Sequence, residues 1–227
     1  MKSLLKLTLL LLLVFTFAAP TLAADESAAK KNDPTKWEKT IAGFEAKDKE
    51  SPPKKGGVLF IGSSSIRMWK LDSSFPDLGG LNRGFGGSQI EDSTYFADRI
   101  VMPYEPRLIV IYAGDNDLAA GKSPVTVAED FRAFVKKVRA KLPKVKIAYI
   151  AIKPSIARLK LMDSVCQANQ LIGKDCEADE LLAFVDIASP MLGDDGKPRE
   201  ELFLKDGLHL NEEGYKVWTK VLLPFLK

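Results

Sequence analysis

The chain has 227 residues, of which 46% are hydrophobic, and its formal net charge is only +3. A chain of this length and apolar content can bury one sizeable core, so we expect a single domain. The near balance of charge excludes a protein that binds nucleic acid mainly by electrostatic attraction.

Residues 1–24 have the pattern of a secretory signal peptide, because Lys2 and Lys6 flank the start of an apolar run that small residues follow. The alternative is an uncleaved membrane anchor, but the run over residues 7–19 is shorter than the ~20 residues that span a bilayer. We therefore expect the segment to be removed and the mature protein to be periplasmic or secreted, with no stable membrane span.

Residues 25–35 are small, charged and unpatterned, which predicts a flexible leader. Over residues 36–49, Trp37, Ile41 and Phe44 recur at helical spacing. This segment is therefore predicted to form a short accessory helix on the outside of the domain, and a Pro- and Gly-rich stretch ends it.

Short apolar runs then alternate with helical patterns, which predicts a doubly wound α/β domain. Five of these runs have the near-continuous apolar character of buried parallel strands. They lie at residues 58–62, 80–85, 107–114, 145–152 and 182–188.

Two helical patterns stand out between and after these strands. The segment 123–143 ends at Pro143 and carries one apolar face, formed by Val127, Phe131, Phe134, Val135, Val138 and Leu142. The segment 211–227 starts with Asn211 as an N-cap, and its predicted inner face consists of Val217, Trp218, Val221, Leu222 and Phe225.

Cys166 and Cys176 lie in one predicted helical segment. Ten residues of helix separate them by about 15 Å, which is beyond disulfide reach. We therefore expect two free thiols, and a helix break at Gly173 is the alternative that would allow a bond.

The loops that follow the strands hold the candidate chemistry, since ligands of such folds bind outside the carboxyl ends of the strands. His209 is the only histidine, so a base that titrates near neutral pH must use it, although a lone histidine can also be structural. Asp206 lies one short turn away and could orient the imidazole. Ser63, Ser64 and Ser65 are candidate nucleophiles, or simply polar residues that cap a turn.

Acyl transfer also needs donors for the oxyanion of its tetrahedral intermediate. Gly87 and Asn116 lie in the loops after the second and third predicted strands. A glycine lets the backbone approach a ligand closely, and an asparagine amide adds a side-chain donor.

Four sequence blocks, around Ser64, Gly87, Asn116 and His209, supply Ser, Gly, Asn and His in this order. With these blocks the chain resembles, from about Val58 onward, the SGNH (GDSL-type) hydrolase superfamily. The resemblance makes Ser64 the nucleophile, because the family's glycine matches Gly62 two residues earlier. Ser63 stands where the family usually has aspartate. The first two blocks are most similar to platelet-activating-factor acetylhydrolase catalytic subunits and bacterial GDSL-like esterases.

The resemblance implies a flavodoxin-like, three-layer α/β/α sandwich with a central five-stranded parallel sheet, within a hydrolase domain over residues 36–227. It also implies a serine esterase of short-acyl esters such as acetyl esters. Ser64, His209 and Asp206 would form the triad, and Ser64, Gly87 and Asn116 the oxyanion hole. This chemistry needs no metal or organic cofactor. The same site could also give lysophospholipase or thioesterase activity.

Two other classes of function remain open. Because the aspartate is missing at Ser63, the domain could be a non-catalytic binding module on the same scaffold. The acid-rich loops GDND and GDDGK could suggest a metal-dependent hydrolase, although one histidine and no cysteine cluster leave few ligands for a transition metal.

The substrate is expected to be a small-molecule, lipid or glycan ester. Lys153 and Arg158 follow the fourth predicted strand, where they could border the pocket and favour an anionic or polar alcohol portion, or be solvated surface charges. Trp69 could pack in the core or form a platform for a sugar.

Overall fold

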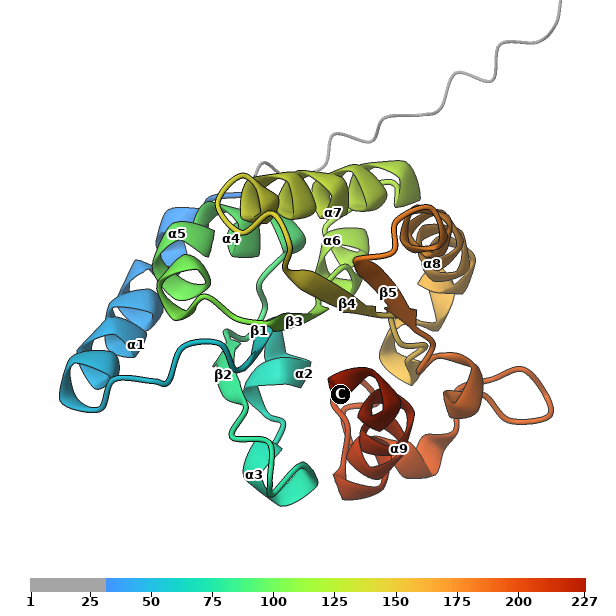
Figure 1. The fold of residues 1–227 in the computed structure, drawn as a ribbon. Helices are drawn as coiled ribbons and strands as arrows, with labels where there is room; N and C mark the ends of the chain where they lie inside the picture. Colours follow the sequence, from blue (N-terminus) through green and yellow to red (C-terminus); the bar gives the residue numbers. More distant parts are fainter. Residues whose placement is uncertain (1–31) are drawn as a thin grey trace, which may run out of the picture.

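The structure, a computed structural model, describes residues 32–227. Five parallel strands form the centre of the molecule. The predicted signal peptide and the leader up to residue 31 lie outside the described residues. The strands run in the order β2-β1-β3-β4-β5 (Figure 1). Their bounds are Val58–Gly62 for β1, Leu81–Gly84 for β2, Leu108–Tyr112 for β3, Lys146–Ile150 for β4 and Leu182–Val185 for β5. The predicted five-stranded parallel sheet is therefore confirmed.

Helices cover both faces of the sheet and complete the predicted three-layer sandwich (Figure 1). One face carries α1 (Glu38–Glu50), α4 (Ile90–Tyr95), α5 (Ala97–Ile100), α6 (Asp115–Ala119), α7 (Pro124–Arg139) and α8 (Met162–Glu177). The other carries α2 (Ser64–Arg67), α3 (Leu71–Ser74) and α9 (Glu212–Leu222). Short 3₁₀ helices are η1 (Pro34–Trp37), η2 (Met102–Tyr104), η3 (Ile156–Leu161), η4 (Ser189–Met191), η5 (Glu200–Leu202) and η6 (Leu223–Leu226).

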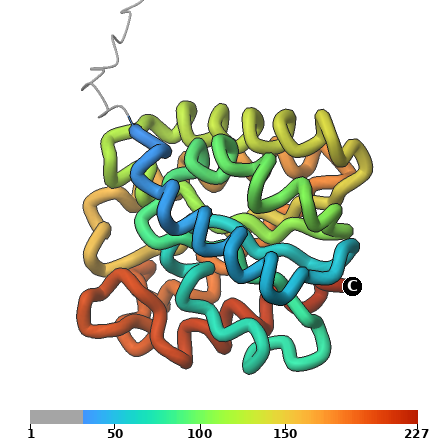
Figure 2. Tube along the Cα trace, turned by 90° about the vertical axis from the view of Figure 1, so that its left-hand side faces the viewer, coloured from blue at the N-terminus to red at the C-terminus, as the bar shows by residue number. Residues whose placement is uncertain are grey.

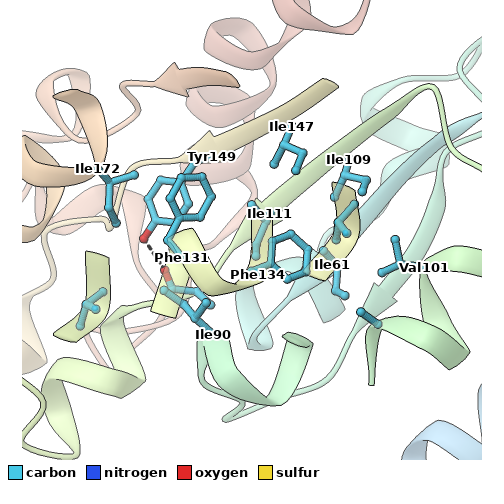
Figure 3. Packing of buried hydrophobic residues seen from close by; sticks show 14 of the residues in the cluster. Ile61, Ile90, Val101, Ile109, Ile111, Phe131, Phe134, Ile147, Tyr149 and Ile172 are labelled. Atoms are coloured by element: carbon cyan, nitrogen blue, oxygen red, sulfur yellow. Dashed lines mark hydrogen bonds between the residues drawn. The ribbon is translucent and has the colours of Figure 1, made fainter. Parts of the chain in front are cut away.

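Alternating strand residues feed two hydrophobic layers, because successive side chains of a strand point to opposite faces. In β1, Leu59 and Ile61 join the layer that contains the buried residues of α7. Figure 3 shows Ile61 in this layer, together with Phe131 and Phe134 of α7. Val58 and Phe60 join the layer under α9. Side chains on both faces are buried, which explains why the strands read as continuous apolar runs.

The N-terminal helix α1 lies along the side of the molecule, and Figure 2 shows it crossing between α7 and the C-terminal segment. Ile41 is its buried residue. The Arg99 guanidinium of α5 donates hydrogen bonds to the carboxylates of Glu38 and Glu45 in α1. The accessory helix is therefore anchored to the domain by both apolar and charged contacts.

The two cysteines of α8 are free, as predicted, whereas the C-terminal segment differs from its prediction at one position. Helix α8 continues through Gly173, and both cysteines are free, Cys166 exposed and Cys176 buried. At the C-terminus Phe225 is wrongly predicted, since it is 38% exposed while Leu226 is buried. The reason is that the chain changes from α to 3₁₀ geometry at Leu223, which shifts the inward position by one residue.

No helix within residues 32–227 has the length and apolar character needed to cross a bilayer.

Candidate active site

The loops after β1, β2 and β3 leave the sheet side by side. Gly62, the last residue of β1, is in register with Gly84 of β2 and Tyr112 of β3. The chain places β2 on one side of β1 and β3 on the other. The loops after β1 and β3 therefore start at the point where the strand order reverses, which is the usual ligand position in such sheets.

The turn after β1 exposes one serine of the three. Gly62 adopts φ +131°, and a Cβ there would lie 1.9 Å from the Tyr112 carbonyl oxygen, so the position requires glycine. Ser63 and Ser65 are buried, and neither hydroxyl has a hydrogen-bond partner within residues 32–227. Ser64, at the start of α2, is partly exposed. Of the three candidate nucleophiles, Ser64 is thus the one a substrate can reach.

The Ser64 side chain lies against the only histidine of the chain. The distance from Ser64 Oγ to His209 Nε2 is 3.1 Å, and that from His209 Nδ1 to Asp206 Oδ2 is 2.6 Å. An ionised carboxylate only accepts, so the Nδ1–H donates to Asp206 and Nε2 remains the acceptor for the Ser64 hydroxyl. The arrangement has the order of a nucleophile, a base and a group that orients the base.

A tight turn holds Asp206 and His209 together before α9 begins. The amides of Leu208 and His209 both donate to Asp206 Oδ1 at 2.9 Å. The hydrogen bond from the His209 side chain, with these two amides, lowers the pKa of Asp206 from 3.8 to about 2. The carboxylate therefore stays ionised throughout the neutral range.

Two backbone amides in the loops after β1 and β2, those of Ser64 and Gly87, are available as donors. Gly87 lies in the turn after β2 at φ +85°, and the ring of Trp37 lies 3.5 Å from the place where a Cβ of Gly87 would be. Within the described part of the chain, neither the Ser64 nor the Gly87 N–H donates a hydrogen bond to a protein acceptor. Trp37 was not singled out by sequence reasoning as a neighbour of this loop, because no short-range pattern links the two segments.

Asn116 connects the loops after β2, β3 and β4. It lies in the first turn of α6, and its Nδ2 donates to the Ser88 carbonyl at 3.0 Å. Its Oδ1 accepts from Arg158 Nη2 at 2.8 Å. The next residue, Asp117, accepts from the Ile90 amide at 3.1 Å. Burial raises the pKa of this carboxyl to about 7, against the effect of Lys122.

Lys153 is buried and paired, and a role for it in substrate binding stays a prediction. Its side chain is 1% exposed, and its ammonium binds Asp115 Oδ2 at 2.9 Å and the Tyr112 hydroxyl at 3.0 Å. The alternative that Lys153 is a solvated surface charge is wrong. The chain after β4 continues through the interior, and Asp115 compensates the buried cation. The part of Asp115 was missed at the sequence level, where it was read as one acid of an acidic loop.

Trp69 is a packing residue and not a sugar platform. It is 3% exposed, and its ring contacts those of Phe60, Phe75, Tyr215 and Trp218.

Within residues 32–227 no cluster of three or more His, Cys, Asp or Glu side chains is arranged to hold a metal ion.

The profile of the GDSL-like Lipase/Acylhydrolase family matches residues 67–217. The chain belongs to this family. The matched range includes Gly87, Asn116, Asp206 and His209, but begins just after Ser64, where Ser63 departs from the family pattern. As a GDSL-like acylhydrolase, the protein is a carboxylic ester hydrolase.

Several solved structures share the fold at low sequence identity. A Streptococcus pneumonia protein named for platelet activating factor has a TM-score of 0.74 at 22% identity, over 85% of this chain and 94% of its own. A GDSL-like lipase from Bacteroides thetaiotaomicron has a TM-score of 0.67 at 21% identity, over 86% and 97%. An acetylxylan esterase from Geobacillus stearothermophilus has a TM-score of 0.62 at 15% identity, over 76% and 96%. A search of curated proteins found no match.

Proposed function

We propose that this GDSL-like hydrolase is a serine esterase that cleaves short-acyl esters, acetyl esters above all, through Ser64, His209 and Asp206. The observation that carries the proposal is the chain of contacts from the accessible Ser64 hydroxyl through both nitrogens of His209 to the Asp206 carboxylate. The acetylxylan esterase among its structural neighbours supports the acetyl preference.

In the proposed mechanism His209 Nε2 takes the proton of Ser64 as Oγ attacks the ester carbonyl carbon. The resulting oxyanion accepts hydrogen bonds from the Ser64 and Gly87 amides and from Asn116 Nδ2. The C–O bond to the alcohol then breaks, and the imidazolium gives its proton to the leaving alkoxide. Water, deprotonated by His209, attacks the acyl-enzyme, and the acid and Ser64 are released.

Substitution of the three serines tests the nucleophile. Ser64→Ala should lower kcat for p-nitrophenyl acetate by about 10³-fold or more and abolish labelling by a fluorophosphonate probe. Ser63→Ala and Ser65→Ala are matched controls that should keep the label, since their hydroxyls are buried. A label that follows Ser63 or Ser65 instead would show that the assignment is wrong.

A series of p-nitrophenyl esters of increasing chain length, together with acetylated sugars, tests the substrate class. We expect kcat/KM to be highest for acetyl esters. A rate that rises with chain length would assign the site to lysophospholipids or long-chain thioesters. Inertness of the pure protein towards the whole panel would favour a binding module.

Export is part of the proposal and is supported by the pattern of residues 1–24. We expect N-terminal sequencing of protein from the periplasm or medium to give a start near Ala24 or Asp25. An intact Met1 would contradict it.

A further inference from the structure

The 3₁₀ helix after β4 places the cationic side chain of Arg158 beside the Asn116 side chain. Arg158, in η3, donates from Nη2 to Asn116 Oδ1 at 2.8 Å. A guanidinium only donates, so the oxygen of the amide must face Arg158 and its nitrogen must point away. The arginine thus fixes the orientation of the Asn116 amide, with its nitrogen turned towards the Ser88 carbonyl.

The Asn116 nitrogen has one more hydrogen than its protein contacts use. One N–H donates to the Ser88 carbonyl at 3.0 Å. Among residues 32–227 the second finds no acceptor, so a donor is left over beside the loop that carries Gly87. A positive charge on the oxygen side withdraws electron density from the amide and strengthens its N–H groups as donors.

Two cations share one carboxylate behind this amide. Asp115 Oδ2 lies 2.9 Å from Lys153 Nζ and 3.2 Å from Arg158 Nη1. Burial would raise the pKa of Asp115, but the charges of Lys153 and Arg158 hold it below 3.8. The cluster therefore has one net positive charge in a position with little solvent. Such fixed charge favours a developing anion more than it would in water.

We propose that Arg158 is a positioning residue that orients and polarises the Asn116 amide as an oxyanion donor, instead of binding the alcohol portion of the substrate. Asp115 holds the guanidinium in place, and Lys153 in turn binds Asp115. This inference rests on the proposed esterase function. It replaces the expectation that Arg158 faces an anionic substrate, because the guanidinium is engaged by Asn116 and Asp115 and its side chain is only 20% exposed.

A double-mutant cycle with Asn116 tests the coupling. Arg158→Met should lower kcat for p-nitrophenyl acetate about tenfold and leave KM within about twofold, while Asn116→Ala should lower kcat by about 10² to 10³. The double variant should be no slower than Asn116→Ala. Arg158→Lys, which keeps the charge, should recover part of the loss. Arg139→Met is the matched control, since Arg139 is 21% exposed and pairs with Asp179 outside the site.

Three outcomes would overturn the inference. The first is a wild-type kcat in Arg158→Met. The second is an unchanged kcat with a KM that rises for anionic esters only, which would place Arg158 on the substrate. The third is losses that multiply in the double variant, which would make Arg158 independent of Asn116. If the methionine variant does not fold, Arg158→Gln replaces it, because glutamine keeps a donor without the charge.

A readout that needs no turnover separates this inference from the proposed function. In protein with ¹⁵N-labelled asparagine, we expect the Asn116 side-chain NH₂ proton resonances of Arg158→Met to lie upfield of those of the wild type. Unchanged resonances would overturn the inference even in an active esterase. A protein that shows the shift but hydrolyses no ester would contradict the proposed function alone.

Discussion

Asp206 uses its two carboxylate oxygens for different purposes. Oδ2 accepts from the His209 ring, and Oδ1 accepts from the backbone amides of Leu208 and His209. Oδ2 thus orients the His209 ring, and Oδ1 holds the backbone of the turn in place. A substitution that alters only one of them can separate catalysis from stability.

Asp206→Asn should abolish most activity while the fold is kept. The asparagine oxygen can still accept from the two amides, but its NH₂ cannot accept from Nδ1–H, so the imidazole takes the wrong tautomer. We expect kcat to fall by about 10³ to 10⁴, and Tm at neutral pH to fall modestly, because the amide lacks the charge that folding favours. Asp206→Ala should lose as much activity and lower Tm further, because the turn also loses its acceptor. An asparagine variant that keeps a tenth of the activity would contradict this role.

The same variant should reveal the low pKa of Asp206. Since the pKa is about 2 in the folded protein and 3.8 is its ordinary value, folding favours the ionised form. The stabilisation is therefore complete above about pH 5 and disappears as the pH falls towards 2. The difference in Tm between wild type and Asp206→Asn should be constant above about pH 5 and shift in favour of the variant below it.

The end of strand β1 depends on one glycine. The positive φ of Gly62 and the 1.9 Å approach to the Tyr112 carbonyl leave no room for a side chain. By contrast, Gly43 lies inside α1, and a Cβ there would meet nothing within 4 Å. The two positions predict opposite effects of the same substitution.

Gly62→Ala should destabilise the protein by about 3 kcal/mol or more, because β1 and β3 would have to separate. Gly43→Ala should stabilise it by about 0.5–1 kcal/mol, the usual gain for alanine over glycine inside a helix. Chemical denaturation of both variants gives the two free energies. Equal effects, or a gain at Gly62, would contradict the steric requirement for glycine at the end of β1.

The elements that sequence could predict are those with long, continuous patterns. All five strands lie within the predicted runs, and α7 begins one residue after the predicted segment does. Helices α4 and α5 were not predicted, because each is a short piece and Phe96 interrupts them. Such pieces show less than two turns of periodicity and are stabilised by tertiary packing.

At the scale of the whole molecule, the sheet separates two apolar layers that share its strands. Trp37 packs on Phe85 in the layer of α1, α4 and α7, whereas Trp69 and Trp218 lie in the layer of α9. These are the only three tryptophans of the chain. Fluorescence can therefore report each layer separately.

We expect the two layers to unfold in one transition, since neither can lose the sheet alone. In Trp37→Phe the remaining fluorescence reports the α9 layer, and in the double variant Trp69→Phe, Trp218→Phe it reports the α1 layer. Within each variant, the fluorescence midpoint should coincide with that from far-ultraviolet circular dichroism. An earlier loss of the Trp37 signal would show that α1 detaches first.

The candidate site shows the same division between local and distant information. The loops that hold Ser64, Gly87 and Asn116 could be predicted because each follows a strand in a parallel sheet, whereas the choice of Ser64 among three serines came from the family resemblance. Asp206 and His209 could be paired because they lie only three positions apart. Their geometry agrees with that prediction, while their catalytic roles stay predictions. The contact of Trp37 with the Gly87 loop and the pairing of Asp115 with Lys153 join segments that no motif links, so only the folded chain reveals them.

The hydrogen bond from Ser64 to His209 spans 145 positions of the chain. A ribosome making this protein therefore completes the serine turn long before it adds His209. Any product that stops short of residue 209 has the proposed nucleophile without the proposed base. Ester cleavage by the proposed pair thus begins only when nearly the whole chain has been translated and α9 has docked. The onset of turnover in a translation reaction would accordingly time the completion of folding.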